Sequence, residues 1–171
     1  MVFTARRFEH LTCCLPLAGV TEPADAAVAI ECGSDLVLAL IAAGGQAVEG
    51  RAAVRRVERV VSRLAAFQVA EIFLAAHRAA EGSPGVSLGI ARISPRRRQV
   101  AFTGLGTVYG ALAGHFPTVL SGRPGTVGVG MPQVPETEIH PWRDGDLIAL
   151  ASDGLVDAWD IAALWRVGDL P

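Results

Sequence analysis

Residues 124–155 read PGTVGVGMPQVPETEIHPWRDGDLIALASDGL, and this stretch decides the fold. Pro124-Gly125 predicts a turn, and Asp144-Gly145 is a strong signal for a tight hairpin turn. The apolar run Leu147–Ala151 that follows predicts a buried strand. Directly after it, Asp153-Gly154 places a carboxylate at a strand end, where a rigid backbone can hold it toward solvent.

The residues before this stretch predict a run of strands, because apolar and polar positions alternate between Gly- and Pro-containing turns. The two strands furthest from it surround the basic tip Ser94–Arg98. The expected strands are Val86–Ile93, Gln99–Gly104, Thr107–Ala113, Phe116–Leu120 and, inside the quoted stretch, an exposed strand Pro135–Pro141.

Further toward the N-terminus the pattern changes to helical spacing. Apolar residues recur every three or four positions, which predicts helices over Gly50–Phe67 and Val69–Ala80. A row of arginines, four apart, follows one face of the first helix: Arg51, Arg55, Arg59 and Arg63. Such a row could grip phosphates, but a solvated helix face is the commoner role.

The N-terminal part predicts a first strand over residues 7–15 and a hairpin formed by Asp25–Cys32 and Asp35–Ala42. A last helix is expected over Val156–Trp165. Strands and helices therefore come in runs and do not alternate one by one, which predicts an α+β fold and not a parallel α/β sheet. We expect one domain over residues 1–171, since no linker or internal repeat interrupts the chain.

The composition is that of a globular protein, with 51% hydrophobic and 19% charged residues. A net charge of -2 gives no electrostatic reason to expect a nucleic-acid or membrane partner. The apolar stretch Leu11–Gly19 follows Arg6 and Arg7 but is short and broken by Pro16, so we reject a secretory signal. We expect a cytoplasmic protein.

The cysteines and histidines give no metal-ligand spacing. We expect Cys13, Cys14 and Cys32 to be small buried hydrophobic residues in a reducing compartment. His10, His77, His115 and His140 are scattered, which makes a zinc site unsupported.

Two glycine clusters invite a phosphate-binding interpretation. Gly44-Gly45 lacks the Lys-Ser/Thr of a nucleotide loop, and Gly104-Leu105-Gly106 has no helix behind it. Turn or close-contact positions are the better interpretation of both. Asp153 likewise has two interpretations, as a ligand for a hard cation or as a turn or helix-capping residue.

Taken together, these segments resemble the RsbX/SpoIIE-like branch of the PPM-type, metal-dependent serine/threonine phosphatases. The resemblance extends from about Phe8 to Pro171 and is carried by two stretches. Residues 85–106 (GVSLGIARISPRRRQVAFTGLG) resemble the family's paired strands and Gly-x-Gly turn. Residues 124–155 share a Pro-Gly-x-Val-Gly turn, a Pro-Trp strand end, Gly-Asp-Leu and Ser-Asp-Gly-Leu, followed by Trp159-Asp160.

The resemblance implies a two-sheet antiparallel β-sandwich flanked by helices, an αββα architecture. It implies two Mn²⁺ or Mg²⁺ ions that activate a water for attack on a phosphoserine or phosphothreonine, so that no side chain is assigned as the catalytic nucleophile. By position in the motifs, Asp153 and Asp25 would be metal-binding carboxylates. Gly44 would hold a metal through its carbonyl group.

The sequence departs from the family at two points. Where the family has an Asp-Gly-x-Gly-His-Gly loop, this chain has Ala43-Gly44-Gly45-Gln46-Ala47-Val48, so Ala43 replaces the bridging aspartate. The family's further C-terminal helix and last strand, with another metal-binding aspartate, are expected to be missing. The acids nearest to that position are Asp157, Asp160 and Asp169.

Losing a residue that only supports a ligand lowers metal affinity or activity about 10–100-fold, and losing two ligands should weaken binding further. The sequence therefore favours a pseudophosphatase, a phosphatase fold that binds a phosphoprotein with weak or no hydrolysis. The expected setting is bacterial stress signalling by partner switching, with a phosphorylated anti-sigma-antagonist-like protein as partner.

Two other functions stay open at this stage. One is an active Mn²⁺- or Mg²⁺-dependent protein serine/threonine phosphatase, and the other is an unrelated α+β ligand-binding domain. An open sheet edge also predicts pairing with another chain, as a homodimer or with a partner strand. Trp159 and Trp165 could instead cover that edge and keep a monomer.

Overall fold

The computed structural model describes residues 8–14, 22–44, 48–131 and 136–153. Within these ranges eight strands form two antiparallel sheets, and two α-helices accompany them. The first is five-stranded, in the order β1-β2-β3-β4-β7, and the second is three-stranded, in the order β6-β5-β8. The α+β sandwich expected from the sequence is confirmed. The expected last helix, Val156–Trp165, lies outside the described residues.

The observed elements follow the sequence pattern closely in most places. The first sheet consists of β1 (Ala26–Cys32), β2 (Asp35–Ala43), β3 (Val86–Ser94), β4 (Gln99–Leu105) and β7 (Glu138–Pro141). The second consists of β5 (Val108–Ala113), β6 (Thr118–Ser121) and β8 (Leu147–Ser152). The helices are α1 (Val48–Leu64) and α2 (Val69–Ala80), with a short 3₁₀ turn, η1, at Pro95–Arg97.

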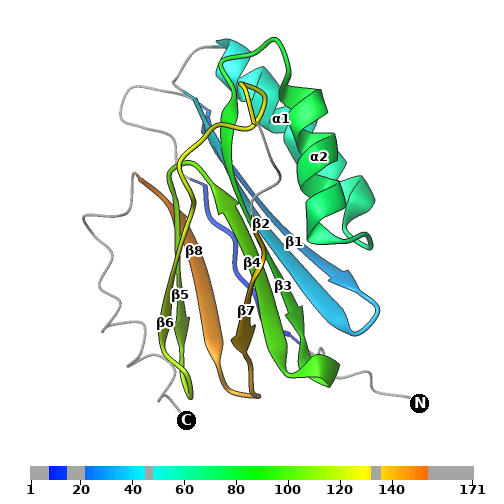
Figure 1. Cartoon of the computed structure of the whole chain (residues 1–171), viewed down its shortest axis with the longest axis vertical. Coiled ribbons are helices and arrows are strands. Elements are labelled where there is room, and N and C mark those ends of the chain that lie inside the picture. The colour runs from blue at the N-terminus through cyan, green and yellow to red at the C-terminus, as the bar shows by residue number, and fades with distance from the viewer. Residues whose placement is uncertain (1–7, 15–21, 45–47, 132–135, 154–171) are drawn as a thin grey trace.

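Helices α1 and α2 cover the outer face of the five-stranded sheet, as Figure 1 shows. Helix α1 buries one stripe at helical spacing, which includes Ala53, Val57 and Val61, and the opposite face carries the arginine row. Arg92 of β3 holds the corner between the helices by donating hydrogen bonds to the carbonyl oxygens of Ala65 (2.6 Å) and Phe67. A stripe of this width is what a helix needs to pack on a sheet.

A second apolar layer lies between the two sheets. It is built from residues of both, including Leu36, Ile93, Phe102, Leu112 and Leu120. Strand β2 is apolar on both faces because one face meets the helices and the other faces the second sheet. This explains why its sequence, DLVLALIAA, lacks the alternation of a half-exposed strand.

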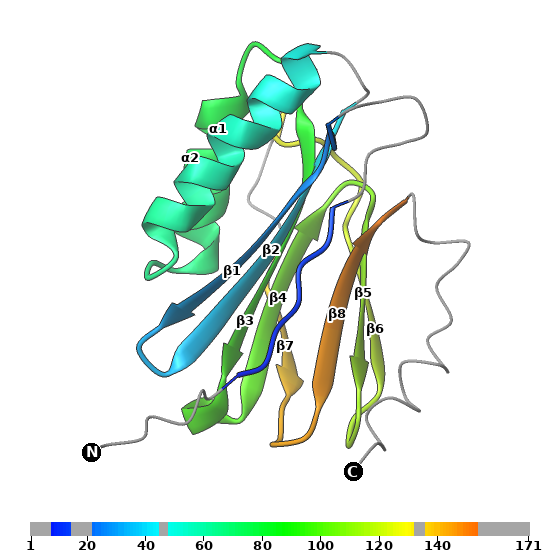
Figure 2. The same ribbon diagram turned by 180° about the vertical axis from the view of Figure 1, so that it is seen from behind.

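Three expectations about local structure differ from the structure. A strand was expected over residues 7–15, but the described residues 8–14 form none, and their backbone groups pair with no described strand. Figure 2 shows this segment passing between the two sheets. The Asp144-Gly145 turn forms, with Asp146 N donating to Arg143 O at 3.0 Å. It does not close a hairpin, however, since β7 belongs to one sheet and β8 to the other. An exposed strand was expected over Pro135–Pro141. Within its described part, which begins at Glu136, only Glu138–Pro141 pairs with β4.

No helix within the described ranges is both long and apolar enough to cross a membrane.

Candidate functional site

The strand ends place Asp25 and Gly44 beside each other. Asp25 directly precedes β1, and Gly44 directly follows β2, which pairs with β1 in the register Ala26↔Ile41. The backbone N–H of Ala43 donates a hydrogen bond to Asp25 Oδ1 at 3.1 Å. One carboxylate oxygen of Asp25 is therefore used to hold the end of β2.

Gly44 is held by backbone contacts with the start of β3. Its N–H donates to the carbonyl oxygen of Gly85 at 3.1 Å. A side chain at position 44 would have no room, because a Cβ there would lie 2.8 Å from Gly85 O and 2.9 Å from Pro84 O. The close approach of two backbones explains the glycine without any metal.

Asp153 lies at the same end of the sandwich as the other two residues. It follows β8, whose Ser152 pairs with Val108 at the start of β5. Thr107, one residue earlier, donates its N–H to Ser87 Oγ at 3.0 Å, and Ser87 pairs with Ala42 near the end of β2. Asp153 is exposed, and no hydrogen bond or ion pair of the described residues joins it to Asp25 or Gly44.

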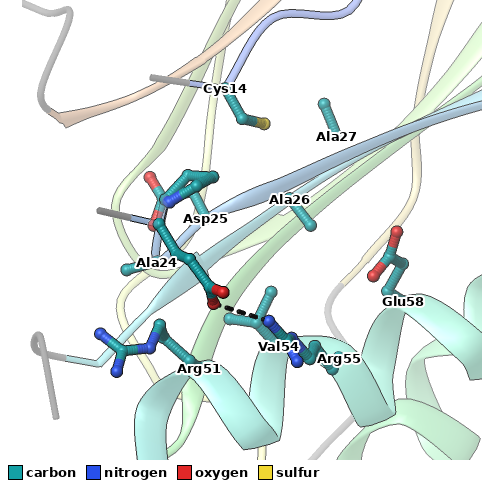
Figure 3. Close-up of a pocket in the computed structure, with 11 residues that line it drawn as sticks. Cys14, Ala24, Asp25, Ala26, Ala27, Arg51, Val54, Arg55 and Glu58 are labelled. Carbon is teal, nitrogen blue, oxygen red and sulfur yellow. Dashed lines mark hydrogen bonds and ion pairs between the residues drawn. The ribbon is translucent and has the colours of Figure 1, made fainter. Parts of the chain in front are cut away.

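A pocket of about 300 Å³ opens beside Asp25, between the start of β1 and helix α1. Figure 3 shows Arg51 and Arg55 on the helix and Cys14 and Asp25 across from them. The remaining residues that line it are Glu22, Pro23, Ala24, Ala26, Ala27, Val54 and Glu58. Its charged side chains have both signs, so the pocket does not select an anion or a cation by charge alone.

Two contacts restrict the chemistry of this pocket. Arg55 forms an exposed ion pair with Glu22 at 2.8 Å, which leaves Arg51 as the pocket's arginine without such a partner among the described residues. Burial raises the pKa of the Cys14 thiol, against a hydrogen bond from the backbone at Ala27. A raised pKa leaves less of the thiol as the nucleophilic thiolate at neutral pH.

Solved structures show which class of protein has this fold. A structure from a study of the bacterial stressosome and its adaptation to control secondary messenger signalling matches with a TM-score of 0.80 and 20% identity, over 86% of this chain and 78% of that one. RsbX in complex with magnesium matches with a TM-score of 0.78 and 19% identity, over 87% and 75%. The phosphatase domain of SpoIIE from Bacillus subtilis matches with a TM-score of 0.71 and 12% identity, over 87% and 48%.

The fold is therefore that of the PPM-type (PP2C) phosphatases, in agreement with the resemblance of the sequence to the RsbX/SpoIIE-like branch. At identities of 20% and below, the similarity establishes the fold alone. No protein-family model matches the chain, and neither does any curated protein sequence. An unrelated α+β fold is no longer a reasonable interpretation.

The described residues at this end do not by themselves form a centre for two divalent ions. Within the described ranges no group of three or more His, Cys, Asp and Glu side chains is arranged to hold a metal. Ala43, where the resemblance implies a bridging aspartate, offers only a methyl group, and one oxygen of Asp25 accepts the N–H of Ala43. Since two ions about 3.5–4 Å apart share bridging ligands, the donor set of the described residues alone is too poor for them.

No site role was assigned from the sequence to three residues of the pocket, Cys14, Glu22 and Glu58. Their sequence positions give no pattern, because two lie before β1 and the third lies on α1. The sequence pattern that points to this pocket is the four-residue spacing of the arginine row, which places Arg51 and Arg55 on one face of the helix.

The expectation that Cys13, Cys14 and Cys32 are buried is wrong, since Cys13 is exposed and the other two are half-buried.

Proposed function

We propose that this chain is a regulator with a PPM-type phosphatase fold. It binds a phosphorylated regulatory protein in the cytoplasm and removes the phosphate group weakly or not at all. The observation that carries the proposal is the contact between Ala43 and Asp25. The position at which the family places a bridging carboxylate presents a methyl group, and the neighbouring acid accepts a backbone N–H at 3.1 Å. The residues implied by the resemblance as ligands, Asp25, Gly44 and Asp153, remain a hypothesis.

The signalling context is proposed from the structures that share the fold. They come from work on the bacterial stressosome, on RsbX, and on the RsbU and RsbW domains of a Mycobacterium tuberculosis protein. A phosphoprotein of the anti-sigma-antagonist type is the partner that fits this context. Active hydrolysis with Mn²⁺ or Mg²⁺ is the competing function, and the RsbX structure holds magnesium.

An activity assay separates the two functions. The purified chain should give little Mn²⁺- or Mg²⁺-dependent hydrolysis of p-nitrophenyl phosphate or of a phosphoserine peptide. Robust turnover that a chelator abolishes would show an active phosphatase and overturn the proposal.

Ala43→Asp tests the physical reason behind this expectation. A second carboxylate beside Asp25 repels the first when no metal is bound, and it becomes an additional ligand when a metal is present. The melting temperature of the variant should fall in chelator and rise by roughly 5–10 °C when Mn²⁺ is about 100-fold above its Kd. The unmodified chain and the control Ala66→Asp, an acid on an exposed position after α1, should show no such rise.

A further inference from the structure

A histidine fastens helix α2 to a loop that is distant in the sequence. The loop comprises residues 126–130 (TVGVG) and is called the glycine loop below. In Figure 1 it belongs to the yellow segment beside the helices. The backbone N–H of Gly128 donates a hydrogen bond to Nδ1 of His77 at 3.0 Å. His77 lies in the last turn of α2, and its side chain is 19% exposed.

The direction of this hydrogen bond fixes the protonation of the ring. A backbone N–H can only donate, so Nδ1 of His77 must accept with a free lone pair. A neutral imidazole has one accepting nitrogen, and its proton is then on the other, Nε2. A protonated ring carries an N–H at both nitrogens and has no acceptor left. The bond from Gly128 therefore exists only while His77 is neutral.

The charged groups near His77 belong to the helices and not to the loop. Nε2 lies 3.9 Å from Oε1 of Glu81, one turn further along α2, and the neighbouring Arg78 is exposed. From α1, Arg56 donates to a carbonyl oxygen near the end of α2 at 2.7 Å. The glycine loop and the start of β3 contain no acidic, basic or histidine side chain. A protonated ring would keep its contact with Glu81, while its Nδ1–H would face the N–H of Gly128, and two facing donors repel.

Gly128 fits closely against the end of α2. Its φ is +95°, and a Cβ at this position would lie 2.6 Å from both Cβ and O of Ala80. On one side of it Val127 is fully buried, whereas on the other side Val129 is 52% exposed. Among the described residues, the bond to His77 is the polar contact that ties this exposed half of the loop to the helix.

Backbone hydrogen bonds connect the glycine loop to the end of β2. Val127 exchanges two bonds with Val86, at 3.0 and 2.9 Å. The preceding residue, Gly85, accepts the N–H of Gly44 at 3.1 Å and donates its own N–H to Ser83 Oγ at 3.1 Å. A shift of the loop would therefore reach Gly44 through two strand contacts.

From these observations we propose that His77 is a pH-sensitive latch. Neutral His77 holds the glycine loop against α2, and protonation of the ring releases the loop and loosens its connection to Gly44. Histidine is the side chain whose charge ordinarily changes between pH 5 and pH 8. The proposal goes beyond the proposed function, because it needs neither a metal ion nor a phosphoprotein.

Amide hydrogen exchange of the full chain, measured by NMR and corrected for the intrinsic rate at each pH, tests the latch. Between pH 8 and pH 5 the protection of the Gly128 amide should fall about three- to tenfold, because one hydrogen bond is lost. The Gly44 amide should lose a smaller factor, and residues 37–40 of β2 should keep their protection. The ¹⁵N shifts of the His77 ring should show an unprotonated Nδ1 at pH 8. A proton on Nδ1 at that pH, or a fall by the same factor at all these amides, would overturn the proposal.

Substitutions at position 77 separate the hydrogen bond from the titration. In His77→Asn a side-chain oxygen takes the place of Nδ1 and binds no proton, so the protection of Gly128 should be kept at both pH values. His77→Leu has no acceptor and should lose that protection about three- to tenfold at both. His10→Asn, the same change at an exposed histidine, should behave like the unmodified chain. If His77→Asn lost protection at pH 5 as the unmodified chain does, another group would be responsible and the latch would be refuted.

Discussion

The two ends of the sandwich differ in how their acidic residues are used. At one end Asp25 accepts one backbone N–H, Gly44 is held by backbone contacts, and Asp153 is exposed. At the other end Asp146, whose side chain is 5% exposed, accepts from His115 N (2.9 Å), His115 Nδ1 (2.7 Å) and Arg143 N (2.8 Å). The end that the resemblance assigns to chemistry thus has the sparser polar network.

The hydrogen bonds to Asp146 should therefore contribute more to stability than the hydrogen bond to Asp25. Asp146 joins the turn after β5 to the turn before β8, and its carboxylate satisfies three donors. We expect Asp146→Ala to lower the free energy of unfolding by about 2–4 kcal/mol, because the charged acceptor and its bonds are lost. Urea denaturation measures this loss. Asp144→Ala, an exposed neighbour in the same turn, should change it by less than about 0.5 kcal/mol.

The pH dependence of stability provides a second test of the contacts of Asp146. Partial burial opposes ionisation of Asp146, but the hydrogen bonds from His115 and Arg143 outweigh it and hold the pKa of the carboxyl below its usual range. A group with a lowered folded-state pKa stabilises the protein above its unfolded pKa of about 3.9, and this stabilisation is lost as the pH falls through the folded value. The Asp146→Ala chain should consequently lose less stability than the unmodified chain between pH 5 and pH 3. Equal losses would contradict this role of Asp146.

At the opposite end, Gly44→Ala tests whether the glycine is needed for backbone packing. A Cβ would meet two backbone oxygens below 3.0 Å, and backbone cannot move aside as a flexible side chain can. We expect destabilisation by about 1–3 kcal/mol. Gly33→Ala is a matched control, because its surroundings are open and only its φ of +62° opposes the change, at about 1–2 kcal/mol. A neutral Gly44→Ala would show that the approach of the two strands is not tight.

The smallest effect is expected at Asp25. Asparagine keeps a side-chain oxygen that can accept the Ala43 N–H, so Asp25→Asn should change stability by less than about 0.5 kcal/mol, whereas Asp25→Ala should lose about 1 kcal/mol. Thermal melts with and without Mn²⁺ give both values. If Asp25→Asn abolished a metal-dependent stabilisation of the unmodified chain, Asp25 would be a ligand and the comparison between the two ends would fail.

The error in the N-terminal segment shows a limit of local patterns. Alternation in residues 7–15 predicted a strand, but a strand exists only where a neighbouring edge supplies hydrogen bonds. Residues 8–14 lie near β8 and do not pair with it. Asp144-Gly145 gave the turn correctly for a related reason, since Gly145 alone fixes a φ of +90°, while the sheet that each flanking strand joins depends on distant residues.

The sequence by itself determined the elements of this protein, because period and turn chemistry are local properties. It predicted both helices, the β1–β2 hairpin and the strands on either side of the arginine tip, and its fixed-order motifs indicated the class of fold. Only the tertiary structure brought Asp25 to Ala43 and His115 to Asp146. These contacts join residues 18 and 31 positions apart, and their partners are set by which sheet each strand enters.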